Sequence, residues 1–590
     1  MTDQKNLILA IVLSAVIMIT YELFFAKRPA PLPPEIAQQT VTPPASGSAG
    51  TAPAVGTASS PVPVPAPAPA TATPAIPGAT TAAGIAGVAP GRAQVIQASP
   101  RVTIDSPRLL GSINLKGGRV DDLLLKDYRT EIDPESQPVL ILSPQGTAEA
   151  YFAEFGWVGN GISLPGPDTI WTANRTTLAV GQPVTLAWRS PEGLTFELIY
   201  DIDPNFLFTI TQRVTNAGAG TVTLYPYGYI SRRGTPPVTG YFVLHEGFLG
   251  VVNGTLKEET YAKLKDSGKI ENDSVGGWVG ITDKYWLTAL VPDQKTAVKT
   301  RFVHTLDGGI DKYQVDFLDA AQALPVGATA ETTNRLFAGA KEVARLDDYA
   351  DRLGIARFDL AIDFGWFYFL TKPIFYALIY LHKLVGNFGL AILLLTVAIK
   401  LAFFPLANKS YKAMSKMRAL QPQMLKLRER YANDKLKLNQ ETMALYKKEQ
   451  VNPAAGCLPM VIQIPVFFAL YKVLFVTIEM RHAPFYGWIK DLSMPDPTSI
   501  FNLFGLLPFT PPDFLMLGVW PLIMGVTMWL QMKLNPQPVD PIQAKVFAFM
   551  PIVFTFMLAA FPAGLVIYWA WNNCLSILQQ WVIMKRMGVV

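Results

Sequence analysis

Several long apolar runs constrain the fold of this 590-residue chain more than any other feature. They cover residues 6–25, 387–406, 458–478, 514–534, 546–561 and 563–584. An α-helix of about twenty residues crosses the roughly 30 Å hydrocarbon core of a lipid bilayer. The runs therefore predict a polytopic α-helical membrane protein with six spans, together with a large water-soluble region.

The first apolar run is predicted to be an uncleaved membrane anchor, residues 1–28. A secretory signal peptide has a shorter apolar core and a small-residue cleavage site. This run is long enough to span a bilayer, and Lys27 and Arg28 follow one residue after it. We therefore favour an anchor over a signal peptide.

The region between the first two runs is expected to hold a linker and a soluble domain. Residues 29–98 are mostly Pro, Ala, Thr and Gly, and such a segment buries too little apolar surface to offset its chain entropy, so a disordered linker is expected. In residues 99–345, segments such as "TFELIYDID" and "NFLFTITQRVTN" alternate apolar with polar residues between turn-forming "PEG" and "NAGAG". This alternation predicts a large antiparallel β-sandwich.

Residues 346–385 are predicted to connect the sandwich to the membrane part. Their second half, 364–385, is rich in Phe, Tyr and Trp and also carries Lys372, Pro373 and His382. A spanning helix is one possibility, but aromatic rings and basic tips are more typical of an amphipathic helix lying in the membrane interface. We therefore expect an interfacial helix here, followed by five spans within residues 386–590.

The loop between the second and third spans, residues 407–450, carries eleven lysines and arginines against four acidic residues. Positively charged loops face the cytoplasm, so the β-sandwich is expected on the opposite, extracytoplasmic side. Apolar residues recur at helical spacing on both sides of "YAND" (431–434), which predicts a hairpin of two amphipathic helices. Its basic residues include Lys409, Lys412, Lys416, Arg418, Arg428 and Arg430. They either only set the topology or also contact RNA phosphates or anionic lipid headgroups.

Three stretches of the sequence resemble a known protein family. "KMRALQPQMLKLRERYANDK", "MALYKKEQVNPAAGCLPMVIQIPVFFALY" and "FPAGLVIYWAWNN" are similar to the YidC family of membrane protein insertases. The anchor and the large outer domain resemble the Gram-negative bacterial branch of that family. The resemblance implies an inner-membrane protein whose periplasmic domain is similar to the supersandwich of sugar mutarotases. It also implies a five-span core around a hydrophilic groove.

The resemblance implies a function as well. Members of the family insert and help fold integral membrane proteins, alone or with the Sec translocon. The expected partners are nascent membrane proteins, the ribosome, Sec translocon components and membrane lipids, and no DNA. No enzymatic activity, metal or cofactor is expected.

Two other classes of protein are considered for this chain. A solute transporter or channel would use an intramembrane lysine for coupling or selectivity, but the paired halves typical of many transporters are not visible in the sequence. An enzyme acting on sugars would need an acid/base constellation in the sandwich. That region contains only His245 and His304 as histidines, with Glu246 beside the first, which gives no compelling active site.

Lys400 is the charged residue of the run "LLLTVAIKLAFFPL" (393–406). A lysine near a helix centre costs about 2.5–3.5 kcal/mol on insertion scales, while each central Leu, Ile, Val or Phe contributes roughly −0.3 to −0.6 kcal/mol. About ten such residues outweigh the lysine, so this helix still inserts. Lys400 either snorkels to the cytoplasmic surface or lies in a charged, hydrated pocket.

Polar residues on several spans support the pocket. The predicted groove contains Lys400, Thr396, Gln463, Gln531, Trp569, Asn572 and Asn573, and the predicted substrate slide contains Phe467, Phe468, Tyr471 and Phe554. By resemblance, the family carries an arginine in the groove where this chain has Lys400. Lysine keeps the charge but lacks the planar fork of arginine, so bidentate carboxylate binding is not expected here. Lys472, in the third span, has no firm explanation beyond snorkelling.

Overall fold

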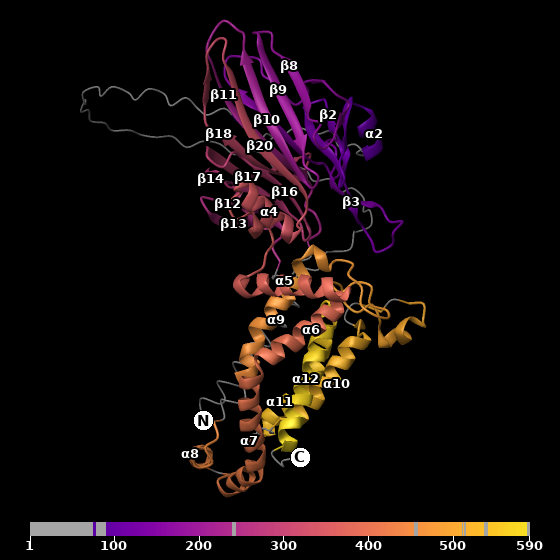
Figure 1. The fold of residues 1–590 in the computed structure, drawn as a ribbon, viewed down its shortest axis with the longest axis vertical. Helices are drawn as coiled ribbons and strands as arrows, with labels where there is room; N and C mark the ends of the chain where they lie inside the picture. Colours follow the sequence, from indigo (N-terminus) through magenta and orange to yellow (C-terminus); the bar gives the residue numbers. More distant parts are fainter. Residues whose placement is uncertain are drawn as a thin grey trace, which may run out of the picture. The chain divides into compact units, whose positions relative to one another are not determined.

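The computed structural model describes residues 75–77, 90–238, 244–432, 434–452, 458–509, 511–512, 515–535 and 541–586. The chain divides into two compact units, Met1–Thr73 and Pro74–Val590, and all described residues belong to the second. The predicted anchor and most of the predicted linker lie outside the described residues. Figure 1 shows the described part as a β-rich region followed along the chain by helices.

The strands form where apolar and polar residues alternate. In β9 (Leu194–Ile202) the side chains of Leu194, Phe196, Leu198 and Tyr200 are buried, and the residues between them are less buried. Successive side chains of a strand point to opposite faces of the sheet, so this pattern buries one face of β9 in the sandwich. β10 (Leu207–Asn216) shows the same alternation and pairs with β9 in antiparallel register.

The described strands form two sheets, one eleven-stranded and one nine-stranded. The larger runs in the order β14 (Lys269–Val275), β17 (Ala297–Asp307), β18 (Ile310–Asp319), β11 (Val222–Arg233), β5 (Tyr151–Gly159), β3 (Arg119–Arg129), β2 (Leu109–Asn114), β1 (Arg101–Asp105) and β7 (Thr177–Leu178). β19 (Gln322–Leu324) pairs with β11, and β4 (Pro138–Leu142) pairs with β3. The smaller runs β13 (Thr255–Glu259), β12 (Gly247–Val252), β15 (Trp278–Thr282), β16 (Trp286–Val291), β20 (Thr329–Ala340), β10, β9, β8 (Val184–Arg189) and β6 (Thr172–Ala173). The predicted β-sandwich is therefore present.

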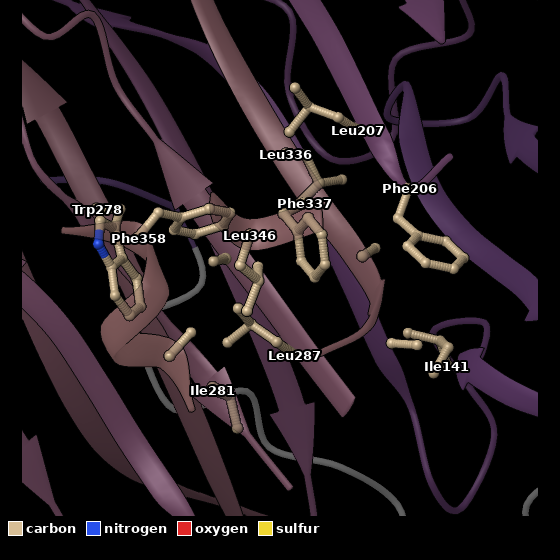
Figure 2. Close-up of a cluster of buried hydrophobic side chains, with 14 of the residues drawn as sticks. Ile141, Phe206, Leu207, Trp278, Ile281, Leu287, Leu336, Phe337, Leu346 and Phe358 are labelled. Carbon is tan, nitrogen blue, oxygen red and sulfur yellow. The ribbon is translucent and has the colours of Figure 1, made fainter. Parts of the chain in front are cut away.

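The segment after the last strand packs into the sandwich. Leu346 of α4 (Val343–Leu353) and Phe358 of η1 (Phe358–Ala361) are fully buried. Figure 2 shows both beside Phe337 and Trp278. The indole nitrogen of Trp278 donates a hydrogen bond to the Ala356 carbonyl at 3.1 Å. The boundary expected at residue 345 therefore falls inside α4, whose apolar face belongs to the core of the sandwich.

The end of the predicted linker is also ordered, contrary to the sequence expectation. Residues Arg92–Gln97 form a short helix, α2, and Arg92 pairs with Asp122. Further upstream, Ile76 is only 2% exposed and packs in a cluster with Tyr227 and Tyr229. Ile76 and Arg92 each contact specific residues of the sandwich, and these contacts hold their segments in place although the surrounding sequence is rich in Pro and Ala. The composition of the segment does not reveal such partners.

The C-terminal part of the chain consists of helices. Those described are α5 (Tyr368–Val385), α6 (Phe388–Ala402), α7 (Phe404–Arg430), α8 (Lys435–Lys448), α9 (Leu458–Val476), α10 (Val519–Leu534), α11 (Pro541–Ala559) and α12 (Ala563–Arg586). A short helix, α3 (Tyr261–Ser267), lies within the sandwich region. α12 contacts α6, α7, α9 and α10, so it forms the centre of the bundle.

α5 and α6 meet at a bend of 120°. Gly386 adopts a left-handed conformation (φ 69°) and its N–H bonds to the His382 carbonyl at 2.7 Å, which ends α5. The Asn387 side chain then accepts a hydrogen bond from the Leu390 N–H at 3.0 Å, which starts α6. Gly386 and Asn387 therefore change the direction of the chain between the two helices.

The second predicted span, 387–406, is interrupted at its end. α6 ends at Ala402 and α7 begins at Phe404, with Pro405 in its first turn. Proline is tolerated in the first helical turn, where its missing N–H would have no partner. Pro405 therefore begins a new helix, and the basic hairpin starts before residue 407.

The helices of the C-terminal part are short compared with a typical membrane span. Among the described residues no single helix meets the criteria of length and hydropathy for crossing a membrane, whereas α5 and α6 meet them jointly as a bent pair. α6 has 15 residues and α10 has 16, which correspond to about 22–24 Å at roughly 1.5 Å per residue.

Candidate functional site

A small cavity of about 40 Å³ lies where α6, α7 and α9 meet. Its lining is mostly apolar, with Lys400, Tyr411 and Gln463 as the polar members. The other lining residues are Ile399, Phe403, Leu406, Ala407 and Val466. The break between α6 and α7 contributes to it directly, since Phe403 lies at that break.

The Lys400 ammonium points toward α12. Its Nζ donates a hydrogen bond to the Ser576 hydroxyl at 2.7 Å, and that hydroxyl donates to the Asn572 carbonyl at 2.8 Å. Lys400 is half-buried, while Ser576 is 2% exposed. Three donors are available on an ammonium, and one of them is directed to a buried hydroxyl of the bundle.

Gln463 supplies the polar group on the α9 side of the cavity. Its amide nitrogen is hydrogen-bonded to the hydroxyl of Tyr568, which is buried on α12. The cavity therefore lies beside two polar contacts to α12, one made from α6 by Lys400 and one made from α9 by Gln463.

Other predicted groove residues do not line this cavity. The Thr396 hydroxyl is buried and donates to the Ile392 carbonyl of its own helix at 2.7 Å. Asn573 donates to the Thr527 hydroxyl of α10 at 3.3 Å. Both side chains therefore make their hydrogen bonds within a helix or between two helices, as polar residues commonly do in membrane helix bundles. Gln531, on α10, is half-buried and is also absent from the lining.

α12 carries buried polar atoms without a partner among the described residues. Oδ1 of Asn572, Oε1 of Gln580 and Nε2 of Gln579 are such atoms. A buried polar atom that makes no hydrogen bond costs free energy. These three atoms therefore mark α12 as a helix whose polar side is suited to contact with water or a polar segment.

Three polar residues at or near the cavity were not predicted. Ser576 and Tyr568 lie on α12, and Tyr411 lies on α7 within hydrogen-bonding reach of Ser576. Asn572 and Ser576 are four residues apart and share a helix face. That spacing is visible in the sequence and would have identified Ser576, whereas the positions of Tyr411 and Tyr568 depend on helix packing.

The predicted slide residues gather around Trp569. The Phe467 ring centroid lies 4.6 Å from that of Trp569 in an edge-to-face contact, and Phe554 lies 6.1 Å from Trp569. Tyr471 stacks along Phe467 at 6.4 Å. Phe468 contacts Phe467 but is 41% exposed. Side chains from α9, α11 and α12 thus form one aromatic cluster, which adjoins Gln463 on α9.

The basic stretch folds as two helices, α7 and α8, which touch where the Tyr446 hydroxyl meets the Met424 sulfur at 3.2 Å. Lys409, Lys412, Lys416 and Arg430 are exposed, and Arg428 is half-buried. Arg418 lies on another face, where it donates to the Leu534 carbonyl at the end of α10 at 3.3 Å. Its guanidinium caps a helix end, so it is not part of the exposed basic face.

Lys472 has a specific partner instead of simply reaching toward solvent. Its ammonium pairs with Asp363 at 2.7 Å, and both side chains are partly buried. Asp363 lies just before α5, and a Cβ at Gly365 would come within 2.9 Å of the Lys472 side chain. The ion pair therefore joins α9 to the start of the segment that leads into α5.

Comparison with known proteins identifies the family to which this chain is similar. Residues 101–377 match the family described as YidC periplasmic domain, and residues 380–589 match the family described as 60Kd inner membrane protein. A membrane protein insertase YidC from Methylobacterium radiotolerans is 52% identical over 598 residues, covering 100% of this chain and 96% of the relative. The insertase of the same name from Bradyrhizobium diazoefficiens is 49% identical, covering 100% and 97%.

Among solved structures, a crystal structure of an active YidC insertase matches with 16% identity. The match covers 81% of this chain and 92% of that one, with a TM-score of 0.34. The two full-length relatives and the two family matches together show that this chain belongs to the YidC family of membrane protein insertases.

Proposed function

We propose that this chain is a membrane protein insertase of the bacterial inner membrane, which inserts integral membrane proteins and helps them fold. It is not an enzyme, because its relatives carry the name of an insertase. The single observation that carries a mechanism is the Lys400 ammonium, which donates to Ser576 beside a cavity with a mostly apolar lining.

The proposed topology has six spans, made of the first apolar run and helices α6, α9, α10, α11 and α12. The hairpin of α7 and α8 lies in the cytoplasm by its excess of positive charge, and the β-sandwich lies in the periplasm. α5 lies in the outer interface. Its exposed face supports this placement, because Phe369 is 74% exposed and Tyr380 is 64% exposed, and Trp366, just before the helix, is 98% exposed.

The proposed mechanism involves no covalent chemistry. A polar segment of a substrate crossing hydrocarbon pays a large desolvation cost. Water and the Lys400 charge beside α12 lower that cost for a short segment, especially for one that carries a carboxylate. The apolar part of the substrate then leaves along the aromatic cluster of Phe467, Trp569 and Phe554, and its burial in lipid drives the step.

The partners of the insertase follow from its exposed groups. The exposed lysines of α7 suit RNA phosphates and anionic lipid headgroups, so a ribosome carrying a nascent membrane protein is the proposed donor of substrate. Cooperation with the Sec translocon is a further part of the proposal. The periplasmic sandwich is proposed to act as a scaffold for partner membrane proteins.

Reconstitution into liposomes tests this function. The purified protein is incorporated into liposomes, a small test membrane protein is synthesised in their presence, and its insertion is measured by protease protection. Wild type is compared with Lys400→Ala and Lys400→Arg. Wild type and Lys400→Arg are expected to insert the test protein, and Lys400→Ala is expected to insert it poorly. Solute flux through the liposomes without any insertion would instead favour the alternative, a transporter or channel.

A further inference from the structure

A loop on the outer side of the bundle is almost free of charge. Between Pro497 and Lys533 the only charged residue is Asp513. The loop precedes α10 and contains the sequence "IFNLFGLLPF" at 500–509. Figure 1 shows it, in gold, extending from the end of α10 nearest α5. We refer to residues 501–509 as the apolar tip.

The apolar tip exposes large hydrophobic side chains instead of burying them. The exposed fractions are 41% for Phe501, 52% for Leu503, 51% for Phe504, 82% for Leu506, 42% for Leu507 and 51% for Phe509. Single exposed apolar residues are ordinary on a protein surface, whereas a contiguous group marks an interaction surface. No polar side chain of the tip interrupts this group except that of Asn502.

The backbone of the tip holds these side chains outward at a cost. Leu503 (φ 51°) and Phe504 (φ 59°) both adopt the left-handed conformation, which L-residues with large side chains disfavour. Such a conformation persists only when surrounding interactions favour it. Backbone hydrogen bonds support this turn, from the Phe504 N–H to the Ser499 carbonyl at 2.7 Å and from the Leu507 N–H to the Asn502 carbonyl at 3.0 Å. The Leu503 and Phe504 side chains remain half exposed, so the turn presents them outward, where an apolar phase would bury them.

The base of the loop is fixed at the outer end of the bundle. Asp496 accepts a hydrogen bond from the Trp520 N–H at 2.9 Å and so caps the start of α10. The Ile500 N–H donates to the Leu517 carbonyl at 3.1 Å, which ties the start of the loop to the residues just before α10. The Asn387 side chain, which caps the start of α6, donates to the Pro484 carbonyl at 3.1 Å. The loop therefore leaves the bundle at the level where α6 and α10 begin.

That level is also the level of α5, which ends two residues before Asn387 with its aromatic face exposed. α10 continues the exposed apolar surface on its own outer face, where Val526 is 57% exposed. The tip thus precedes a helix whose own exposed apolar face is placed in the membrane by the proposed topology. Because it carries no charge, it has nothing to offer an acidic or basic protein partner.

We infer that the apolar tip is a membrane anchor that inserts into the outer leaflet, with its Leu and Phe side chains at the boundary between headgroups and acyl chains. The partner is the lipid surface itself. The tip thereby fixes the depth and tilt of α10 independently of α5. This inference rests on the proposed placement of α10 in the membrane and does not depend on insertase activity.

Fluorescence in proteoliposomes tests the inference. In full-length protein with Cys457→Ser and Cys574→Ser, an environment-sensitive dye is attached at Leu506→Cys or at Phe509→Cys. Val526→Cys on α10 serves as the membrane reference, and Lys263→Cys, exposed on the sandwich, serves as the water reference. Lipids with a spin label at acyl carbon 5 or carbon 12 report depth, and iodide reports exposure to water.

Both tip labels are expected to be quenched at least about twofold more by the carbon-5 lipid than by the carbon-12 lipid, as befits a shallow site. Tip labels that behave like Lys263→Cys would overturn the inference. Protection from iodide without lipid quenching would mean that protein covers the tip, which also overturns it. Absence of quenching at Val526→Cys would overturn the placement of α10 together with the anchor, which distinguishes that failure from failure of the tip alone.

Discussion

Replacing Lys400 with methionine separates the charge of this side chain from its bulk. The cavity of about 40 Å³ has room for roughly three water molecules at about 10–15 Å³ each. A substrate carboxylate separated from Nζ by one water would lie about 6 Å away, where the attraction is roughly 3 kcal/mol at an effective dielectric constant of about 20. That energy corresponds to a factor of about 100 in rate.

The assay compares two substrates in proteoliposomes that contain either the wild-type protein or a variant. One single-span test protein carries Asp in its short translocated segment, and its matched control carries Asn at the same place. Lys400→Met is expected to slow insertion of the Asp substrate by up to about 100-fold and the Asn substrate much less, because only the former loses a charge attraction. Lys533→Met, at the end of α10 where the lysine stacks on Trp529, is the control for removing a lysine elsewhere.

An equal loss for both substrates would refute this reasoning, because it would show that Lys400 supports the bundle and does not attract substrate. Lys400→Glu extends the same logic. Reversal of the charge turns the attraction into a repulsion of similar size, so the Asp substrate should fall further than it does with methionine. If Lys400→Glu inserts the Asp substrate as wild type does, the electrostatic mechanism is wrong.

Other predictions concern the support of this site. Lys472→Met and Asp363→Asn should each lower the thermal stability of the full-length protein, and the double variant should lose less than their sum, with a coupling of about 1–3 kcal/mol for a partly buried pair. Phe467→Ala should slow insertion more than Phe468→Ala, since only Phe467 contacts Trp569; equal effects would contradict the proposed exit path. Burial raises the pKa of Asp319 to about 6, so the folded protein favours the protonated side chain. Its contribution to the free energy of unfolding is fully present below about pH 4 and is lost as the pH rises through 6, a loss of roughly 3 kcal/mol. Hydrogen exchange of β18 should report this pH dependence in wild type and not in Asp319→Asn.

Local patterns predicted the elements, and packing decided how they meet. Alternation in "TFELIYDID" predicts a strand because burial of every second side chain is a property of that segment alone. The order of strands is different, since β11 pairs with β5 and β18, which are distant in sequence. Nothing in the sequence of β11 specifies those partners, so the sandwich was predictable and its topology was not.

The same distinction applies to the site. Lys400 was identifiable because a charge within an apolar run stands out, but its partner Ser576 lies 176 residues away. Thr396 looked equivalent to Lys400 because it lies four residues earlier on the same helix, yet its hydroxyl bonds to its own backbone. A short hydroxyl can satisfy itself within a helix, whereas an ammonium cannot. That chemical difference explains why only one of the two reaches the cavity.

The bond to Ser576 also bears on why a lysine can serve at this position. A guanidinium offers five donors in a fixed planar fork, whereas an ammonium offers three donors that rotate with a flexible stem. One of the Lys400 donors is engaged by Ser576, whose hydroxyl is in turn tied to the Asn572 carbonyl. These two hydrogen bonds fix the position of the Lys400 charge beside α12 without the planar geometry of a guanidinium. The site therefore retains a positive charge at a fixed position, with two further N–H donors for water or a carboxylate. This arrangement is sufficient for an electrostatic attraction but not for bidentate recognition.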